Sequence, residues 1–485
     1  MGDDLFEGLP VHGARRSAQV GRGAARMREP VRDQVELRAV DIDSLIGQDH
    51  AVRVIWSYVE GLDLSTLEDR IKAREHRPGH PPISPRLLLA LWLYASSDGV
   101  GSARALERQC GSHDVYRWLC GGVSVNYHTL SDFRVGCADL LDRLLAEHLA
   151  ALAGAGLVTL DCLAQDGVRV RASAGAASFG RKATLDRHLS IAEAVVDQLK
   201  HEVDARSDAS TRRIEAARER AARERGERLR AAQVALDEIE RHRQAREEKR
   251  GNGKKPKEPR ASSTDAQARV MKMADGGFRP GYNVQVASTA GEQFVVGLEV
   301  TNAGSDRGLM RPMLERLRAL SGHLPRRYLA DGGFGSAEDI EWAHGEGVEV
   351  FCPPTQSKHG TDPFLPRRGD GPGVSAWRAR MASEAGKAQY KPRSICECVH
   401  ARWRNWNLRQ LTVRGIERSR PSCSATHSPT ISCKAIGSPT AKPRPSPSAH
   451  TRPSERSAQS SDARLHRPAK TGQNRTISKA SQALS

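Results

Sequence analysis

The sequence predicts a mixed α/β domain that follows an all-helical domain. Apolar residues recur at helical spacing between residue 40 and about residue 153. Strand-like runs then occur at 157–172, 282–287 and 294–300, and a strand, a turn and a helix surround Asp331. Two hairpin strands followed by alternating strand and helix are typical of a mixed α/β fold.

The composition indicates a polyanionic partner. The chain has 485 residues and a net charge of +17, with 75 Lys and Arg against 58 Asp and Glu. Nucleic acid is the first candidate, because each cation placed on a phosphate releases counterions, although Arg-rich coding is an alternative source of the charge. No apolar run approaches the roughly 18 residues of a membrane span, and the start lacks a signal-peptide pattern. We expect a cytoplasmic protein without a membrane partner.

The N-terminal part divides into a leader and a helical domain. Residues 1–39 are rich in Gly and Arg without an apolar period, so we expect a disordered leader. Residues 40–153 contain short helical patterns joined by Gly-containing turns, which are typical of a helix-turn-helix type of DNA-binding domain. A helical packing or dimerisation module is the alternative.

The next domain, predicted over 154–417, begins with a strand that carries Asp166 at its middle. A carboxylate inside a strand is costly unless it is paired, bound to metal or at the surface, and the sequence leaves these choices open. Residues 186–262 are rich in Arg, Glu and Ala, with apolar residues at helical intervals. They predict a charged helical insertion that ends in a linker.

Asp331 follows a short strand and precedes a glycine-rich turn. A carboxylate at a strand end is held by the sheet while its head group faces solvent, where metal ions and phosphates can reach it. Ordinary turn composition is the alternative. Before this strand, a helix is predicted from about Arg307 to Leu320, with Ser305 or Asp306 as its N-cap.

A third acidic position lies in the segment that begins at Tyr390. Arg393, Glu397 and Arg404 are separated by steps of four and seven, which place them on one face of a helix. A carboxylate between two cations suits a metal ion and a phosphate together. A surface ladder of ion pairs is the alternative.

Together with Asp166 and Asp331, this segment resembles the DDE transposases of bacterial insertion sequences, in the group whose final glutamate lies within a Tyr-x2-Arg-x3-Glu-x6-Lys/Arg signature. The N-terminal domain resembles the InsH-type transposase domain. Residues from about 40 to 417 carry the resemblance, through Phe133-Arg134, Gln165-Asp166-Gly167-x-Arg169, Gly281-Tyr282-Asn283-Val284-Gln285, Asp331-Gly332-Gly333-Phe334 and Leu411-Thr412-Val413-Arg414-Gly415.

The resemblance implies an RNase H-like fold in which Asp166, Asp331 and Glu397 converge. In the family these three carboxylates bind two Mg²⁺ ions, with Mn²⁺ as an alternative, and catalyse DNA strand cleavage and transfer. It also implies DNA contacts by Tyr390, Arg393, Arg404 and, in the N-terminal domain, Arg134. The implied partners are the double-stranded terminal inverted repeats and the target DNA, bound by a homo-oligomer that is associated with the nucleoid.

The sequence departs from the family after about residue 417. Residues 418–485 are rich in Ser, Pro, Arg and Thr where relatives have an apolar helix, so we expect a disordered tail. A frameshift near residue 418 is our hypothesis, and it would leave Glu397 poorly supported. The alternative function is therefore a catalytically inactive, decayed transposase that only binds DNA. A metal-dependent nuclease without strand transfer explains less, because it leaves the N-terminal domain without a purpose.

Overall fold

The computed structural model describes residues 39–73, 80–204, 209–250, 258–356 and 360–424. The predicted leader lies outside the described residues except for Ala39, and so does the predicted tail from residue 425 onward.

The N-terminal domain is helical, as predicted. Its centre is α3 (Pro85–Ser97), in which ten of the thirteen residues are buried. Pro85 stands in the first turn of this helix, where its missing N–H is not needed. The other elements are η1 (Ile42–Leu45), α1 (Ala51–Glu60), α2 (Ser65–Glu68), α4 (Ala103–Ser112), α5 (Asp114–Cys120), α6 (Tyr127–Gly136) and α7 (Ala138–Gly154).

The second domain is built on a mixed sheet with the strand order β4-β5-β1-β7-β8, in which β6 also pairs with β5. β1 is antiparallel to β5 and parallel to β7, and β7 is parallel to β8. The strands are β1 (Cys162–Arg171), β4 (Arg269–Lys272), β5 (Phe278–Thr289), β6 (Val295–Thr301), β7 (Arg327–Ala330) and β8 (Glu349–Phe351).

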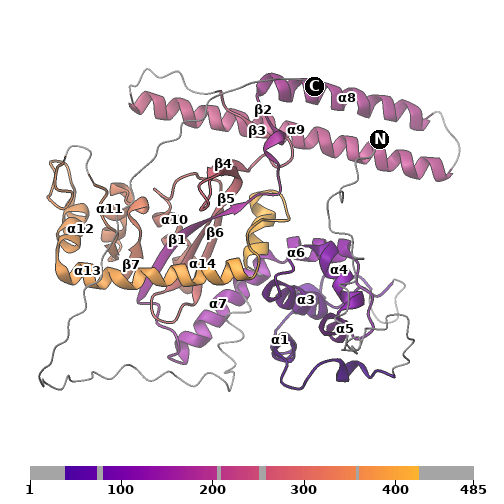
Figure 1. Cartoon of the computed structure of the whole chain (residues 1–485), viewed down its shortest axis with the longest axis horizontal. Helices are drawn as coiled ribbons and strands as arrows, with labels where there is room; N and C mark the ends of the chain where they lie inside the picture. The colour runs from indigo at the N-terminus through magenta and orange to yellow at the C-terminus, as the bar shows by residue number, and fades with distance from the viewer. Residues whose placement is uncertain (1–38, 74–79, 205–208, 251–257, 357–359, 425–485) are drawn as a thin grey trace, which may run out of the picture. The chain divides into compact units, whose positions relative to one another are not determined.

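Helices cover both faces of this sheet. Val284 and Val286 of β5 pack in one cluster with Trp403 from α14 (Ile395–Asn405). Ala287, next on β5, packs in another cluster with Met313 from α10 (Met310–Ser321). Successive strand residues point to opposite faces, so the two helices lie on opposite sides of the sheet. Figure 1 shows α14 running across the strands. The remaining elements of this domain are η2 (Ala176–Ser178), η3 (Gly332–Phe334), α11 (Ala337–Gly345), α12 (Pro372–Ala382), α13 (Glu384–Tyr390) and η4 (Lys391–Ser394).

The predicted charged insertion is a helical hairpin of α8 (Lys182–Asp204) and α9 (Ala209–Arg250), which lie side by side (Figure 1). Leu185 of α8 and Leu229 and Leu236 of α9 form its small core. The hairpin leaves the domain at β2 (Phe179–Gly180) and rejoins it at β3 (Ala261–Ser262). These two short strands pair with each other, so the points of departure and return are adjacent.

Residues 416–424 form a further helix, so the boundary predicted at residue 418 falls inside an element of the fold. Ser419 and Cys423 are fully buried, and Cys423 packs in the same cluster as Val399 and Trp403 of α14. Composition missed this helix because its buried residues are a serine, a proline and a cysteine. Within the described residues, no helix combines the length and apolarity needed to cross a bilayer.

Candidate active site

The two aspartates are neighbours because of the register between β1 and β7. These strands are parallel, and Gln165 of β1 stands opposite Ala330 of β7. The next residue along the chain is an aspartate in both cases: Asp166 lies within β1, and Asp331 directly follows β7, so the two are neighbours. Asp331 also caps η3 by accepting a hydrogen bond from the Gly333 N–H at 2.7 Å. The sheet and this turn therefore fix where both carboxylates lie.

Glu397 lies in the first turn of α14, which brings its carboxylate to the same guanidinium, that of Arg393, as the two aspartates. The preceding residue, Cys396, is buried, and its thiol donates a hydrogen bond to the Ala164 carbonyl of β1 at 3.3 Å. Val399 and Trp403 bury the same helix against the sheet. The helix is thus anchored on β1 two residues before Asp166, and the Glu397 carboxylate extends from its exposed side.

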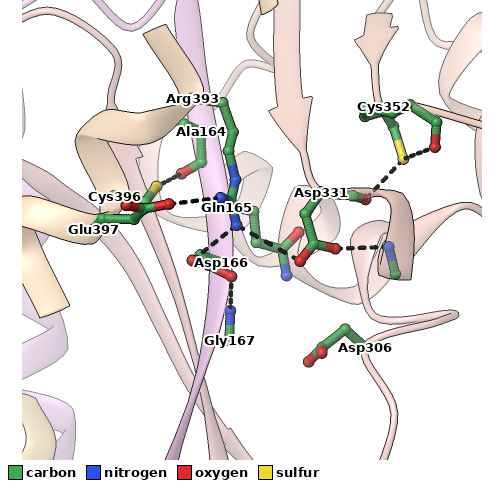
Figure 2. Close-up of polar contacts among 12 residues, drawn as sticks. Ala164, Gln165, Asp166, Gly167, Asp306, Asp331, Cys352, Arg393, Cys396 and Glu397 are labelled. Carbon is green, nitrogen blue, oxygen red and sulfur yellow. Dashed lines mark hydrogen bonds and ion pairs between the residues drawn. The ribbon is translucent and has the colours of Figure 1, made fainter. Parts of the chain in front are cut away.

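The guanidinium of Arg393 lies among the three carboxylates (Figure 2). Its Nη2 is 2.9 Å from Asp166 Oδ2 and 3.6 Å from Asp331 Oδ2, and its Nη1 is 3.3 Å from Glu397 Oε1. The side chains of Arg393 and Asp166 are 14% and 15% exposed, whereas those of Asp331 and Glu397 are 40% and 68% exposed. The structure therefore brings the three predicted acidic residues together around one cation.

Burial raises the pKa of Asp166 to about 6, and this effect exceeds the opposing influence of Arg393 and of the Gly167 N–H. Asp331 and Asp306 raise the same pKa further by charge repulsion. His400, three residues after Glu397, lies with its Nδ1 3.6 Å from Asp166 Oδ2. Burial, Arg404 and Arg393 lower the pKa of His400 to about 4, so this imidazole is neutral near pH 7. Arg393 is therefore the main positive charge on Asp166.

The motif Gln165-Asp166-Gly167-x-Arg169 is explained by a hydrogen-bond network on the face of β1 opposite Asp166. Asp306, from the loop before α10, accepts hydrogen bonds from Arg169, Asn283 and Gln285 at 2.7–3.1 Å. Gln165 donates to Gln285 and accepts from Tyr328, at 2.8 Å in each case. The network joins the strands that flank the aspartates, and sequence reasoning missed Asp306 in it. The only sequence signal is the alternation of polar residues along β1 and β5.

Gly167 provides a test of this network. A Cβ at this position would lie 2.5 Å from Asp306 Oδ1 and 2.5 Å from Gln285 Nε2. Both atoms belong to hydrogen-bonded groups, of which Gln285 is buried and Asp306 is partly buried, so Gly167→Ala is expected to lower the free energy of unfolding by roughly 1–3 kcal/mol. Urea unfolding would measure the loss. Gly291→Ala is the matched control, because a Cβ there meets nothing within 4 Å; an equal loss in both variants would contradict the packing argument.

The donor set suits Mg²⁺, since three carboxylates supply the hard oxygen ligands that this ion prefers. All three already lie within ion-pair distance of one cation, the Arg393 guanidinium. Their spacing fits that wide planar group more closely than a small ion. Among the residues that the structure describes, no three His, Cys, Asp or Glu side chains stand close enough to enclose a metal ion. A metal site therefore requires the carboxylates to close in where the guanidinium now lies.

The other predicted DNA contacts fall in two different environments. Arg404 is exposed on α14. Tyr390, at the end of α13, is partly buried against the apolar cluster that contains Ala287 and Met313. Arg134 is only 5% exposed. Its guanidinium stacks 4.2 Å from the Trp92 ring and donates to the Gly101 carbonyl at 2.7 Å. This placement favours a structural role for Arg134 in the helical domain.

Carboxylates on two adjacent strands and a third on a helix across the sheet define the class of DDE enzymes, which have an RNase H-like fold. Two family models match the chain: the Transposase domain (DUF772) over residues 40–135 and the Transposase DDE domain over residues 229–420. Together they cover more than half of the sequence, and the chain belongs to the DDE transposases of insertion sequences. Searches of curated proteins and of solved structures found no match.

The family matches also show which parts of the site rest on geometry alone. The DDE match includes Asp331 and Glu397, but Asp166 lies between the two matched ranges. Its place in the site follows from the β1–β7 register and from the ion pair with Arg393.

Proposed function

We propose that this transposase binds the terminal inverted repeats of its element and cleaves and transfers DNA strands there, with Asp166, Asp331 and Glu397 as the catalytic carboxylates. The observation that carries the proposal is that all three surround a single cation position, although they come from β1, the end of β7 and α14. Three carboxylates gathered at one point repel one another unless a cation lies between them, and a divalent-metal site requires such a gathering.

The three carboxylates would hold two Mg²⁺ ions, which activate water or a DNA 3′-hydroxyl and stabilise the leaving oxygen. The protein's own part is to fix the ligands. The β1–β7 register sets the two aspartates side by side, and the buried face of α14 sets Glu397 beside them. Arg404, seven residues after Glu397 on α14, provides an exposed cation for the DNA backbone. Tyr390 borders the same site.

The helical domain would recognise the inverted repeats, because it matches a transposase domain that precedes the catalytic part of the chain. We also propose that the protein acts as a homo-oligomer on DNA and is associated with the nucleoid when bound, since two element ends must be held together for strand transfer.

Metal-dependent cleavage of labelled DNA carrying the ends that flank the gene tests the proposal. With Mg²⁺ or Mn²⁺, the native chain is expected to cut at the ends, and Asp331→Asn is expected to reduce cutting by roughly 10³-fold or more. Asp275→Asn is the matched control, because Asp275 is an exposed carboxylate that pairs with Arg279 four residues away. Binding to the ends without cutting by the native chain would instead support the inactive DNA-binding alternative.

A further inference from the structure

We propose that Arg393 exchanges partners: its guanidinium holds the three carboxylates together until divalent ions bind, and ion binding releases it to a DNA phosphate. The inference rests on the proposed function and deepens it. It makes one side chain the link between metal binding and DNA binding.

The first step is that Arg393 is built into the acidic cluster. One guanidinium reaches carboxylates from three separate elements, and its side chain is 14% exposed. Its Nη1 and Nη2 make all of these contacts, while its buried Nε has no hydrogen-bond partner among the described residues. The arrangement stabilises three negative charges that would otherwise repel one another across the site.

The second step is that the guanidinium and divalent ions exclude each other. Mg²⁺ is bound at 2.0–2.1 Å from its oxygen ligands, and the same Asp166 Oδ2 that would bind it is 2.9 Å from Arg393 Nη2. A guanidinium and a doubly charged ion on the same carboxylates would also repel each other. Metal binding therefore requires the Arg393 side chain to leave the cluster.

The third step is that Arg393 can leave without unfolding the domain. Its backbone lies in η4, a single short turn between α13 and α14 in which no residue is buried. Only its side chain enters the cluster, so rotation about side-chain bonds is enough to bring the guanidinium to the surface. A guanidinium released there presents a planar fork that binds phosphate oxygens through two parallel hydrogen bonds.

The consequence is a thermodynamic linkage. If metal binding frees Arg393 for DNA, DNA binding must favour metal binding by the same factor. The coupling is expected to be roughly 5- to 150-fold, the usual range for linked sites. Without Arg393, metal binding should be tighter and no longer coupled to DNA.

The experiment compares the native chain with Arg393→Gln, Arg393→Lys and Asp166→Asn, and with Arg402→Gln as a matched control. Arg402 lies in the adjoining helix α14, and it donates to Gln293 outside the cluster. Isothermal titration measures the affinity for Mn²⁺ alone. Fluorescence anisotropy measures the affinity for a duplex carrying the element end, in EDTA and in Ca²⁺, which also binds oxygen ligands. Thermal unfolding in EDTA checks that each variant is folded.

We expect Arg393→Gln to bind Mn²⁺ about tenfold or more tightly than the native chain, and to unfold at a lower temperature in EDTA. Arg393→Lys keeps the charge but loses the planar fork, so its Mn²⁺ affinity should lie between those of Arg393→Gln and the native chain. Arg402→Gln should bind Mn²⁺ as the native chain does. Ca²⁺ should strengthen DNA binding by the native chain and by Arg402→Gln, but not by Arg393→Gln.

Two results would overturn the inference in distinguishable ways. If the native chain binds Mn²⁺, Asp166→Asn does not, and neither Arg393 variant binds more tightly than the native chain, the metal site exists but Arg393 does not compete for it. If Asp166→Asn binds Mn²⁺ as well as the native chain, the carboxylate cluster is not the metal site, and the proposed function fails together with the inference. Arg393→Lys decides the question if Arg393→Gln is unfolded.

Discussion

Glu397→Gln is expected to abolish metal-dependent cutting of the element ends, by roughly 10³-fold or more, while the fold and DNA binding are retained. The amide keeps the size of the side chain but removes the anionic oxygen that a divalent ion requires. The fold should be unaffected because the Glu397 side chain is 68% exposed, and its contact with Arg393 in η4 has the most exposed partner of the three that Arg393 makes. An ion pair with one partner this exposed to solvent contributes roughly 0–1 kcal/mol.

Single-turnover cleavage, end binding and thermal unfolding would be measured in parallel. Glu384→Gln is the matched control, because Glu384 lies in the first turn of α13, is 89% exposed and pairs with Lys387. Cutting by Glu397→Gln at the native rate would remove this residue from the catalytic set. Loss of folding would show that its role is structural.

Cys423→Asp is expected to lower the free energy of unfolding of the catalytic domain by roughly 4 kcal/mol, because a carboxylate there must either lose its water shell or take up a proton, and both cost several kcal/mol. Cys423 is fully buried in the helix over residues 416–424, beside Val399 and Trp403 of α14. Because α14 carries Glu397, metal-dependent cutting should be lost with the same variant.

Chemical unfolding would measure this loss, with Cys398→Asp as the control for the substitution. Cys398 is exposed near the start of α14, where a negative charge interacts favourably with the helix dipole. Equal stability of the two variants would show that residues 416–424 do not pack on the core, as the frameshift hypothesis would have it. A large difference would show that the altered sequence still supports Glu397.

The carboxylates of the candidate site could be predicted from the sequence because they stand in local patterns. Asp331 lies between a strand and a glycine turn, and Glu397 shares a helix face with Arg393 and Arg404. Their convergence was expected only from the family resemblance. It depends on the β1–β7 register, which joins two segments far apart in the chain and leaves no trace in local spacing.

Other features could not be predicted because burial decides them. Ser305 or Asp306 was expected to cap a helix that starts at about Arg307, but α10 starts at Met310 with Leu309 at its N-cap, and the Asp306 carboxylate pairs with Arg169. The boundary predicted at residue 418 falls inside a helix for the same reason, since Ser419 and Cys423 are buried without a strong apolar pattern. Arg134 illustrates the reverse case, in which a charged residue that was expected to contact DNA packs on Trp92. Spacing alone gives no information on tertiary partners.

The pairing of β2 with β3 has a consequence for how this enzyme can vary in length. Phe179 and Ser262 face each other across that pair, so the chain between them begins and ends at one point. The entropy cost of closing such a loop grows only slowly with its length, so lengthening or shortening the loop changes the stability little. It does not shift β1 against β7. A one-residue change within β1 would move Asp166 to the other face of the sheet, whereas α8 and α9 can gain or lose whole turns while the three carboxylates keep their places.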